Sequence, residues 1–461
     1  MDLTLEQIRY WIGAEPATAR SIGAAALGYS IDSRTIQPGD LFFAIHGERF
    51  DGHDFVESAL KAGAVAAVVA KAQSHRYPAA TIRQQLFVVD DPLSALQRLA
   101  SSVRRHWGKR VIGITGSAGK TTTKEVVAQV LESRFRVHKS AGNLNNHYGL
   151  PLQLLKLQPE HEIAILEMGM SHAGEIAALC RIAAPDWGIV TNVGTAHGEN
   201  FPDGQAGIAR AKYELIASLP RHGLAILNCD DAYVQQFGRD FVGKTIYYGA
   251  GACADPRAES ITPMGVDGTK FTVLAGEQRA EMQLPLLGEH NVRNALAGIA
   301  AGLASGIPLA ACAAALKEMS APDKRGQVLH IDGAIVLNDC YNSNPAALRA
   351  MVDTLLTIPA QRRIVVAGEM LELGSSSAQL HRECGEYMAK RGIDVVLGVR
   401  GEATSIVFGA KAAGAEATFI ATPEDAGVWL REHLQPKDAV LLKASRGVRL
   451  ERALEVLQEK I

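Results

Sequence analysis

Apolar residues in this 461-residue chain gather in short unbroken runs that alternate with amphipathic stretches. The runs 111–115, 163–166 and 188–193 are largely apolar, rich in β-branched residues, and carry no charge. Such runs are typical of parallel strands that helices cover on both faces. The stretches between them have the length of helices. The pattern therefore predicts an α/β fold built on parallel sheets.

Interruptions of this pattern divide the chain into three units. Asp91-Pro92 precedes a predicted helix over 93–107 and indicates the first boundary. Pro322 indicates the second, and the five apolar runs after it alternate with helices, as in a doubly wound, Rossmann-like domain. These runs cover 334–338, 364–367, 395–399, 418–421 and 439–442. The expected units are an N-terminal α/β domain at 1–90, a central domain at 91–321 and a C-terminal domain at 322–461.

Two stretches of the central domain depart from the alternation of strand and helix. The polar stretch 245–283 alternates with period two, which predicts an antiparallel insert or an edge. The stretch 295–316 carries no charge, but it consists mainly of Ala and Gly, and Gly306-Ile307-Pro308 interrupts it. It is therefore interpreted as two helices joined by a turn, not as a membrane span.

Composition narrows the class of protein. The net charge is −2 and no basic stripe is present, so no nucleic-acid partner is expected. The six cysteines are scattered without a CxxC pair, which favours reduced thiols over a disulfide framework or a zinc site. The N-terminal segment MDLTLEQIRYWIGAE lacks the plan of a signal peptide. We expect a cytoplasmic protein without membrane insertion.

The segment VIGITGSAGKTTTKEVVAQVL, from Val111 to Leu131, has the features of a phosphate-binding loop. A buried strand, a glycine-rich turn and a helix start follow one another there. The strict GxxxxGK spacing fails by one position, and the alternative is an ordinary strand-to-helix turn. Lys120 is expected to contact nucleotide phosphates and Thr121 a magnesium ion. The candidate nucleotide ligands are Gly116, Ser117, Ala118, Gly119, Lys120, Thr121 and Thr122.

Two predicted strands of the same sheet end in residues suited to catalysis. Glu167 follows one strand in LEMGM, and His197 lies just beyond another in TNVGTAH. Ligands of open α/β sheets bind at these strand ends, and Glu167 can coordinate the magnesium of a bound nucleotide. Each residue alone is more often structural, but after a phosphate loop they mark a candidate active site. Lys212, judged from its neighbours alone, is a solvated helix lysine paired with Glu214.

Amide side chains form a second group of candidates. Asn145 and Asn146 lie between the phosphate-loop helix and the Glu167 strand. They can direct amides at phosphate or substrate, or only satisfy turn geometry. Asn291 and Asn294 lie three apart at a helix start, where they can bond a base or ribose, or serve as caps.

The third unit offers a further set of polar residues. Asp339, Tyr341 and Asn342 directly follow a predicted strand, where an Asp commonly accepts ribose hydroxyls. Arg325 lies at the domain junction, from which a cation can reach a phosphate. The sequence contains no GxSxG elbow and no pattern typical of a Ser-His-Asp or Cys-His nucleophile. The absence of a covalent nucleophile favours direct phosphoryl transfer to a substrate.

Taken together, these motifs resemble the Mur ligase family over essentially the whole chain. The segments that carry the resemblance are TGSAGKTT, GNLNNHYGLP, LEMGM, TNVGTAH, RAKYE and GEHNVRNA. Within the family, the branch that adds D-alanyl-D-alanine (D-Ala-D-Ala) is the most similar. The segments that point to it are DSRTIQPGDLFFAIHGERFDGHDF, NDCYNSNPAALRAM and GEMLELGSSSAQLHRECG. The DNPR-type motif of the diaminopimelate-adding branch is absent.

The resemblance implies an enzyme with a UDP-substrate domain, a P-loop ATPase domain and a Rossmann-like C-terminal domain. It implies that ATP phosphorylates the terminal carboxylate of UDP-N-acetylmuramoyl-tripeptide (UDP-MurNAc-tripeptide). The amine of D-Ala-D-Ala then attacks the acyl phosphate, giving the amide, ADP and phosphate. Most relatives act as monomers.

The resemblance also assigns roles to residues. It gives Thr121 and Glu167 to one magnesium ion and His197 to a second, with Lys212 carbamylated into an anionic metal ligand. Carbamylation needs a neutral amine, hence a lysine with a lowered pKa. Residues facing the adenosine or its phosphates are Asn291, Asn294, Arg325 and Asp339. Residues near the substrates are Ser33 and Arg34, beside the uridine diphosphate, and Tyr341 and Asn342.

Two departures from the family pattern concern the dipeptide site. Glu369 stands where an Asp is usual, and Ala444 stands for the Gly of a KGSR motif. The alternatives are another ligase, such as folylpolyglutamate synthetase or the diaminopimelate-adding enzyme, and a P-loop ATPase that only regulates or binds. The DSR segment argues against the folylpolyglutamate enzyme, and Glu167, His197 and Lys212 argue against an inactive one. The sequence leaves the tripeptide's third residue open, lysine or diaminopimelate.

Overall fold

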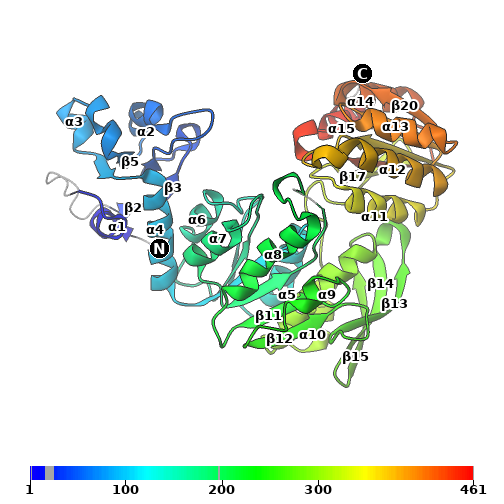
Figure 1. Ribbon diagram of the computed structural model, residues 1–461, viewed down its shortest axis with the longest axis horizontal. Coiled ribbons are helices and arrows are strands. Elements are labelled where there is room, and N and C mark those ends of the chain that lie inside the picture. Colours follow the sequence, from blue (N-terminus) through cyan, green and yellow to red (C-terminus); the bar gives the residue numbers. More distant parts are fainter. Residues whose placement is uncertain (2, 16–24, 196–197, 460–461) are drawn as a thin grey trace.

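Three α/β units follow one another in the computed structural model of the chain, with the N-terminal and C-terminal units at opposite ends (Figure 1). The structure describes residues 1, 3–15, 25–195 and 198–459. Each unit contains its own parallel or mainly parallel sheet. The predicted α/β fold with three domains is therefore confirmed. Every helix of the described residues is too short or too polar to cross a bilayer.

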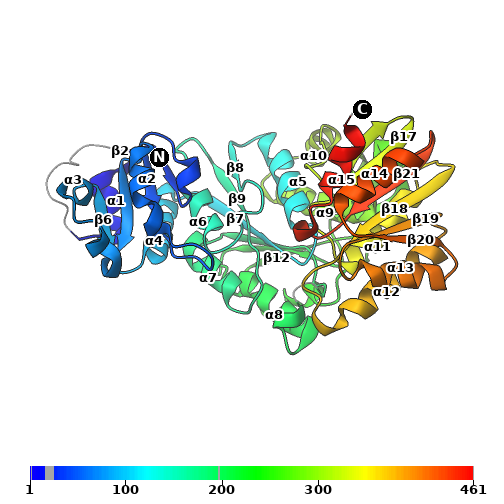
Figure 2. The same cartoon turned by 90° about the horizontal axis from the view of Figure 1, so that it is seen from above.

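The first unit has a four-stranded parallel sheet in the order β3-β4-β5-β6. Its strands are β3 (Gly28–Ser30), β4 (Asp40–Phe43), β5 (Ala66–Ala70) and β6 (Leu86–Val89). A small antiparallel pair, β1 (Leu3–Thr4) and β2 (Ala25–Ala26), lies beside it. Helix α1 (Leu5–Ile12) packs on α4 (Pro92–Trp107), which begins at the N-cap Asp91 and leads into the central unit (Figure 2).

The central unit is built on a six-stranded parallel sheet in the order β12-β11-β10-β7-β9-β8. Its strands are β7 (Arg110–Thr115), β8 (Val137–Lys139), β9 (Ile163–Glu167), β10 (Trp187–Val190), β11 (Leu224–Asn228) and β12 (Lys244–Tyr248). β7 therefore lies between β9 and β10. This neighbourhood brings the phosphate-loop strand beside the two strands whose ends carry the other candidates.

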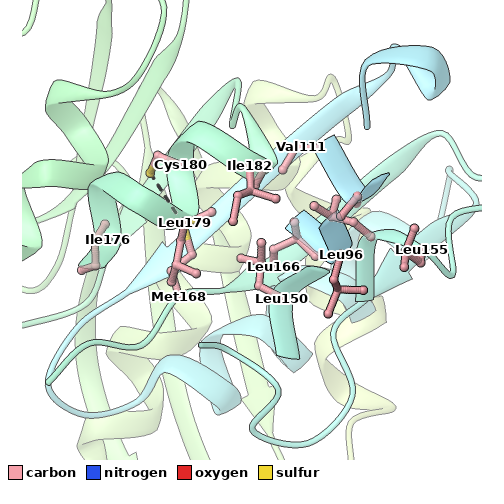
Figure 3. Close-up of a cluster of buried hydrophobic side chains, with 14 of the residues drawn as sticks. Leu96, Val111, Leu150, Leu155, Leu166, Met168, Ile176, Leu179, Cys180 and Ile182 are labelled. Atoms are coloured by element: carbon pink, nitrogen blue, oxygen red, sulfur yellow. Dashed lines mark hydrogen bonds between the residues drawn. The ribbon is translucent and has the colours of Figure 1, made fainter. Parts of the chain in front are cut away.

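Alternating side chains of β7 and β9 fill two different cores. Val111 and Leu166 face α4, α6 (Gly149–Leu154) and α7 (Glu175–Ala183), together with Leu96 and Leu179 (Figure 3). Ile112 and Ile165 face the opposite core with α5 (Lys120–Glu132) and α9 (Glu289–Ala304). Because both faces are covered, the inner positions of both strands are apolar, and the prediction from the unbroken runs is confirmed.

The stretch 245–283, predicted as an antiparallel insert or an edge, contains both: an edge strand in its first part and an antiparallel insert in its second. Strands β13 (Arg257–Pro263), β14 (Thr269–Ala275) and β15 (Gln278–Leu284) form a three-stranded antiparallel sheet. β12 pairs in parallel with β11 and forms the edge of the main sheet. The two predicted helices are present as α9 and α10 (Leu309–Lys317).

The third unit has a six-stranded sheet in the order β16-β17-β21-β18-β19-β20. The five predicted strands are β17 (Ala334–Asp339), β18 (Arg362–Gly368), β19 (Val395–Val399), β20 (Glu416–Ile420) and β21 (Asp438–Lys443). The sequence prediction missed β16 (Gln327–Ile331), which pairs antiparallel with β17. Its mixed burial gives it no unbroken apolar run.

The expectation that all cysteines are reduced is wrong for one pair. The structure joins Cys229 and Cys253 in a disulfide, with Cα atoms 6.0 Å apart. Cys229 follows β11 and Cys253 lies in the loop after β12, so neighbouring strand ends bring together residues that are 24 positions apart. Sequence spacing alone carries no sign of this contact. The four free cysteines, Cys180, Cys312, Cys340 and Cys384, are buried.

Candidate active site

The loop between β7 and α5 has the close backbone approach that a phosphate-binding loop needs. Gly116 (φ 151°) would bring a Cβ within 1.8 Å of Thr191 Oγ1. Gly119 (φ 79°) would bring one within 2.6 Å of Asn294 Oδ1. Only glycine fits at both positions. The helix begins at Lys120, so its free N–H groups and partial positive charge face the loop.

Residues after β10 hold this loop in shape. Thr191 Oγ1 donates to the carbonyl oxygen of Ala118 at 2.6 Å, and Asn192 Oδ1 accepts the Ala118 N–H at 2.9 Å. Ser117 Oγ accepts the N–H of Gly194 at 2.8 Å. Thr191 and Asn192 are not among the residues predicted for the site. Their position directly after the apolar run of β10 was the available signal.

Glu167 lies at the end of β9, buried, with both carboxylate oxygens engaged. Oε2 accepts from Thr121 Oγ1 at 2.7 Å, and Oε1 accepts from Asn145 Nδ2 at 2.7 Å. A hydroxyl and a carboxylate are the hard oxygen donors that Mg²⁺ prefers, with water and phosphate oxygens as its other ligands. Among the described residues, no group of three or more His, Cys, Asp or Glu side chains is suited to a metal ion. The donor set thus fits magnesium held together with a nucleotide, not a dedicated protein cage.

Lys120 lies over the phosphate loop. Its Nζ donates to the carbonyl oxygen of Gly116 at 2.8 Å. Burial lowers the pKa of Lys120; the nearby Glu167 carboxylate opposes this shift and the Arg325 guanidinium adds to it. Arg325 belongs to the third unit, so the two units are close enough here for their charges to interact.

Lys212 is buried on α8 (Gly204–Ala217). Burial, and secondarily the charge of Lys120, lowers the pKa of Lys212 well below its ordinary value. The interpretation of Lys212 as a solvated lysine paired with Glu214 is therefore wrong. The carboxylate of Glu214 instead accepts the N–H groups of Gly174 and Ala177, at 2.6 and 2.9 Å, near the start of α7.

The remaining candidates of the central unit have different surroundings. Asn294 Oδ1 accepts from Thr123 Oγ1 at 3.1 Å, and its Nδ2 donates to Asn291 Oδ1 at 2.9 Å, so both amides lie behind the phosphate loop. Asn146 Oδ1 caps the start of α6 by accepting the N–H of Gly149 at 2.9 Å. His197 lies outside the described residues.

Polar residues of the third unit gather at the ends of β17 and β21. The guanidinium of Arg325 lies 3.9 Å from the ring centroid of Tyr341. Burial raises the pKa of Tyr341; Arg325 opposes the shift, and Glu167 of the central unit adds to it. Lys443 Nζ is bonded to the Asp339 carboxylate and donates to the Asn342 carbonyl oxygen at 2.9 Å. The structure thus brings Arg325 and Tyr341 toward the phosphate loop.

The two departures from the family pattern are accommodated locally. Glu369 Oε1 accepts the N–H of Glu402 at 3.1 Å. Ala444 is fully buried. The predicted uridine diphosphate residues Ser33 and Arg34 belong to the first unit and lie apart from the phosphate loop, with Arg34 exposed and paired with Asp32 at 2.6 Å.

Family comparisons match all three units. The description "Mur ligase family, catalytic domain" matches residues 27–104, "Mur ligase middle domain" matches 114–302, and "Mur ligase, glutamate ligase domain" matches 324–446. The middle-domain match begins within β7 and includes Lys120, Glu167 and Lys212. The match therefore contains the central part of the candidate site.

Relatives and solved structures agree with these matches. The chain is 37% identical over 436 residues to the UDP-N-acetylmuramoyl-tripeptide--D-alanyl-D-alanine ligase of Bacillus subtilis, covering 94% of this chain and 93% of that protein. It is 34% identical to the Escherichia coli protein of the same name, covering 93% of each. MurF from Acinetobacter baumannii superposes with a TM-score of 0.89 at 29% identity, over 100% and 99% of the two chains. MurF from Thermotoga maritima in complex with ADP superposes with a TM-score of 0.80 at 29% identity, over 94% and 97%. The chain belongs to the Mur ligase family.

Proposed function

We propose that this protein is an ATP-dependent ligase that joins D-Ala-D-Ala to UDP-MurNAc-tripeptide and releases UDP-MurNAc-pentapeptide, ADP and phosphate. The single observation that carries the proposal is the Thr121–Glu167 hydrogen bond of 2.7 Å at the start of the phosphate-loop helix. A hydroxyl and a carboxylate held together beside the loop support a magnesium site next to the phosphates of ATP. The names of the B. subtilis and E. coli relatives and the ADP complex of the T. maritima MurF support the substrates.

The chemistry requires activation of a carboxylate. A carboxylate is a poor electrophile, and transfer of the γ-phosphoryl group of ATP turns it into an acyl phosphate with a good leaving group. The amine of D-Ala-D-Ala attacks the carbonyl carbon, a tetrahedral intermediate collapses, and the carbon–oxygen bond to phosphate breaks. Because anions must approach one another, charge neutralisation supplies most of the lowering of the barrier.

Residues of the phosphate loop would bind and orient the triphosphate. The N–H groups from Gly116 to Thr122 at the start of α5 would face the phosphate oxygens, and Lys120 would move from Gly116 to the β- and γ-phosphates. Thr121 and Glu167 would hold a magnesium ion, which supplies positive charge at the transferring phosphoryl group. Asn145 would keep the Glu167 carboxylate oriented.

Other residues would bind a second magnesium ion, the adenosine of ATP and the two substrates. Lys212, whose pKa is lowered by burial, would react through its neutral amine with carbon dioxide to give a carbamate and a proton, and the carbamate would be an anionic ligand for a second magnesium ion together with His197. The proposed contacts with adenosine or its phosphates come from Asn146, Asn291, Asn294, Arg325 and Asp339. The proposed substrate contacts come from Ser33 and Arg34 for the uridine diphosphate, and from Tyr341 and Asn342. The protein would act as a monomer in the cytoplasm.

Phosphate release tests this function. It should require ATP, UDP-MurNAc-tripeptide and D-Ala-D-Ala together, with one ADP formed per amide. Parallel assays with the lysine and the diaminopimelate tripeptide would identify the third residue. Release of phosphate from ATP alone, unchanged by both substrates, would favour the alternative of a P-loop ATPase.

A further inference from the structure

A buried lysine outside the phosphate loop links the two elements that carry the proposed magnesium donors, α5 with Thr121 and β9 with Glu167. Lys124 lies on α5, one turn after Lys120, and is 1% exposed. Its Nζ donates to the carbonyl oxygen of Ser140 and pairs with Glu125 Oε1 at 3.0 Å. Burying an ammonium group is costly unless its donors are satisfied. The contacts with Ser140 and Glu125 therefore fix where this side chain can lie.

Ser140 lies directly after β8 and is 2% exposed. Its N–H donates to the carbonyl oxygen of Ile165 at 3.0 Å, and its Oγ accepts the N–H of Glu167 at 3.1 Å. Ser140 thus contacts α5 through its carbonyl oxygen and β9 through its N–H and hydroxyl. The backbone of Glu167 is held by the same residue that Lys124 holds.

The segment that begins with Ser140 also supplies Asn145, whose Nδ2 donates to Glu167 Oε1 at 2.7 Å. The N–H of Gly169 donates to the Asn145 carbonyl oxygen at 2.9 Å, so the segment wraps around the end of β9. The other oxygen of Glu167 bonds to Thr121, three residues before Lys124 on α5. One face of α5 therefore supplies two groups. The Thr121 hydroxyl is a proposed metal donor, and the Lys124 ammonium group anchors the segment that surrounds Glu167.

We propose that Lys124 is a positioning residue for the magnesium nucleotide: by anchoring Ser140 to α5, it fixes the Glu167 carboxylate at the distance from Thr121 that a shared metal ion requires. The inference rests on the proposed function of the Thr121–Glu167 pair. Hydrogen-bonded partners of metal-binding carboxylates typically contribute 10–100-fold to metal affinity or activity. We expect an effect of that size.

The test compares Lys124→Met with Lys139→Met. Lys139 precedes Ser140 in the chain and pairs with the same Glu125, at 2.7 Å, but its side chain is 39% exposed and forms no hydrogen bond with Ser140 or Glu167. Mn²⁺ binding in the presence of ADP, followed by electron paramagnetic resonance, is the readout, with ADP affinity without metal and the melting temperature as companions. Lys124→Met is expected to weaken Mn²⁺ binding about 10-fold or more while metal-free ADP binding changes less than twofold, and Lys139→Met to leave both unchanged.

Each outcome decides a different question. Wild-type protein that binds no Mn²⁺ with ADP would overturn the proposed function itself. If the wild type binds Mn²⁺ and a folded Lys124→Met variant binds it with the same affinity, only the role of Lys124 is overturned. This holds whatever the melting temperature of the variant. If Lys124→Met does not fold, Ser140→Ala decides, because it removes the acceptor of the Glu167 N–H but keeps the carbonyl contact. A folded Ser140→Ala protein with wild-type Mn²⁺ affinity would overturn the proposal.

Discussion

Gly374 of the third unit lies against Glu199 of the central unit. A Cβ at Gly374 would lie 3.1 Å from the Cβ of Glu199. The two residues belong to short turns, Gly198–Asn200 and Gly374–Ser376, that contact each other across the two units. Together with the proximity of Arg325 to Lys120, this contact describes a closed arrangement over the phosphate loop.

A larger side chain at this contact should impair closure. We expect Gly374→Leu to lower kcat/KM by about 10–100-fold, because a small displacement of reacting groups has effects of that order. Gly392→Leu is the matched control, since Gly392 also has a positive φ (81°) but has open space around its Cβ position. Equal losses in the two variants would mean that backbone strain, not the contact with Glu199, is responsible.

Lys120→Ala should abolish turnover without unfolding the protein. Among the described residues, the Lys120 ammonium group donates to the Gly116 carbonyl oxygen alone, so its loss leaves the central cores intact. Steady-state kinetics and the melting temperature check this expectation. A variant with a near-normal rate would contradict the proposed role of Lys120.

Lys212→Met should separate stability from activity. A buried amine that cannot keep its charge costs stability, so the variant is expected to be more stable than wild type by about 1–3 kcal/mol, while kcat falls at least 100-fold. The lowered pKa also makes stability depend on pH. Below the ordinary lysine pKa, the unfolded chain binds a proton at Lys212 more readily than the folded protein does. The stability of the wild type should therefore rise as the pH rises toward the ordinary lysine pKa.

Carbamylation of Lys212 can be observed directly. Protein equilibrated with ¹³C-bicarbonate should give a carbamate carbon resonance that is absent from Lys212→Met. The same resonance in both proteins would assign it to another amine and contradict the carbamylation of Lys212.

His138 makes the fold sensitive to acid. Burial, aided by His161, lowers the pKa of His138 to about 4. Between about pH 6.5 and 4 the unfolded chain therefore binds a proton that the folded protein does not, so stability falls as the pH falls, by up to about 3 kcal/mol. His138→Leu should reduce the slope of urea-derived stability over this range, with the remainder coming from His290, whose pKa burial also lowers to about 4, and exposed His75→Leu is the control. Parallel pH profiles of wild type and His138→Leu would contradict the assignment.

The three units should not unfold as three independent blocks. Leu5 and Ile8 of the first unit share one core with Leu96 of α4 and Leu166 of β9. The cores beneath and above the third sheet are two further clusters, and Leu287, with Val266 packed beside it, is the central unit's contribution to one of them. Differential scanning calorimetry is expected to resolve two components, one for the first two units together and one for the third. A single two-state transition would show that the third unit is coupled to the rest.

Much of this architecture was predictable because burial on both faces imposes apolar runs on parallel strands. The β7–α5 junction is the clearest case, since strand, glycines and helix start each leave their own mark. β16 was missed because its partly exposed residues carry no such run. The disulfide of Cys229 and Cys253 was missed because sheet order, not sequence spacing, creates the contact.

The same distinction applies to the site. Glu167 was predictable from its position at a strand end, but its bonds to Thr121 and Asn145 depend on three segments meeting in space. Lys212 was misjudged from its helical neighbours, because burial is set by the packing of α8 and not by the residues four positions away. The side chains of Asn192 and Lys124 bond to backbone groups of Ala118 and Ser140. Because every residue has such groups, the sequence does not indicate these contacts.

The proximity of Arg325 to Lys120 also bears on how the cycle ends. The two cations repel each other, the Glu167 carboxylate offsets this repulsion at Lys120, and the triphosphate would act as a further counter-ion shared by both units. Departure of ADP and phosphate would remove that shared counter-ion and weaken the attraction between the third unit and the central one. Reopening for the next substrates would then need no separate trigger.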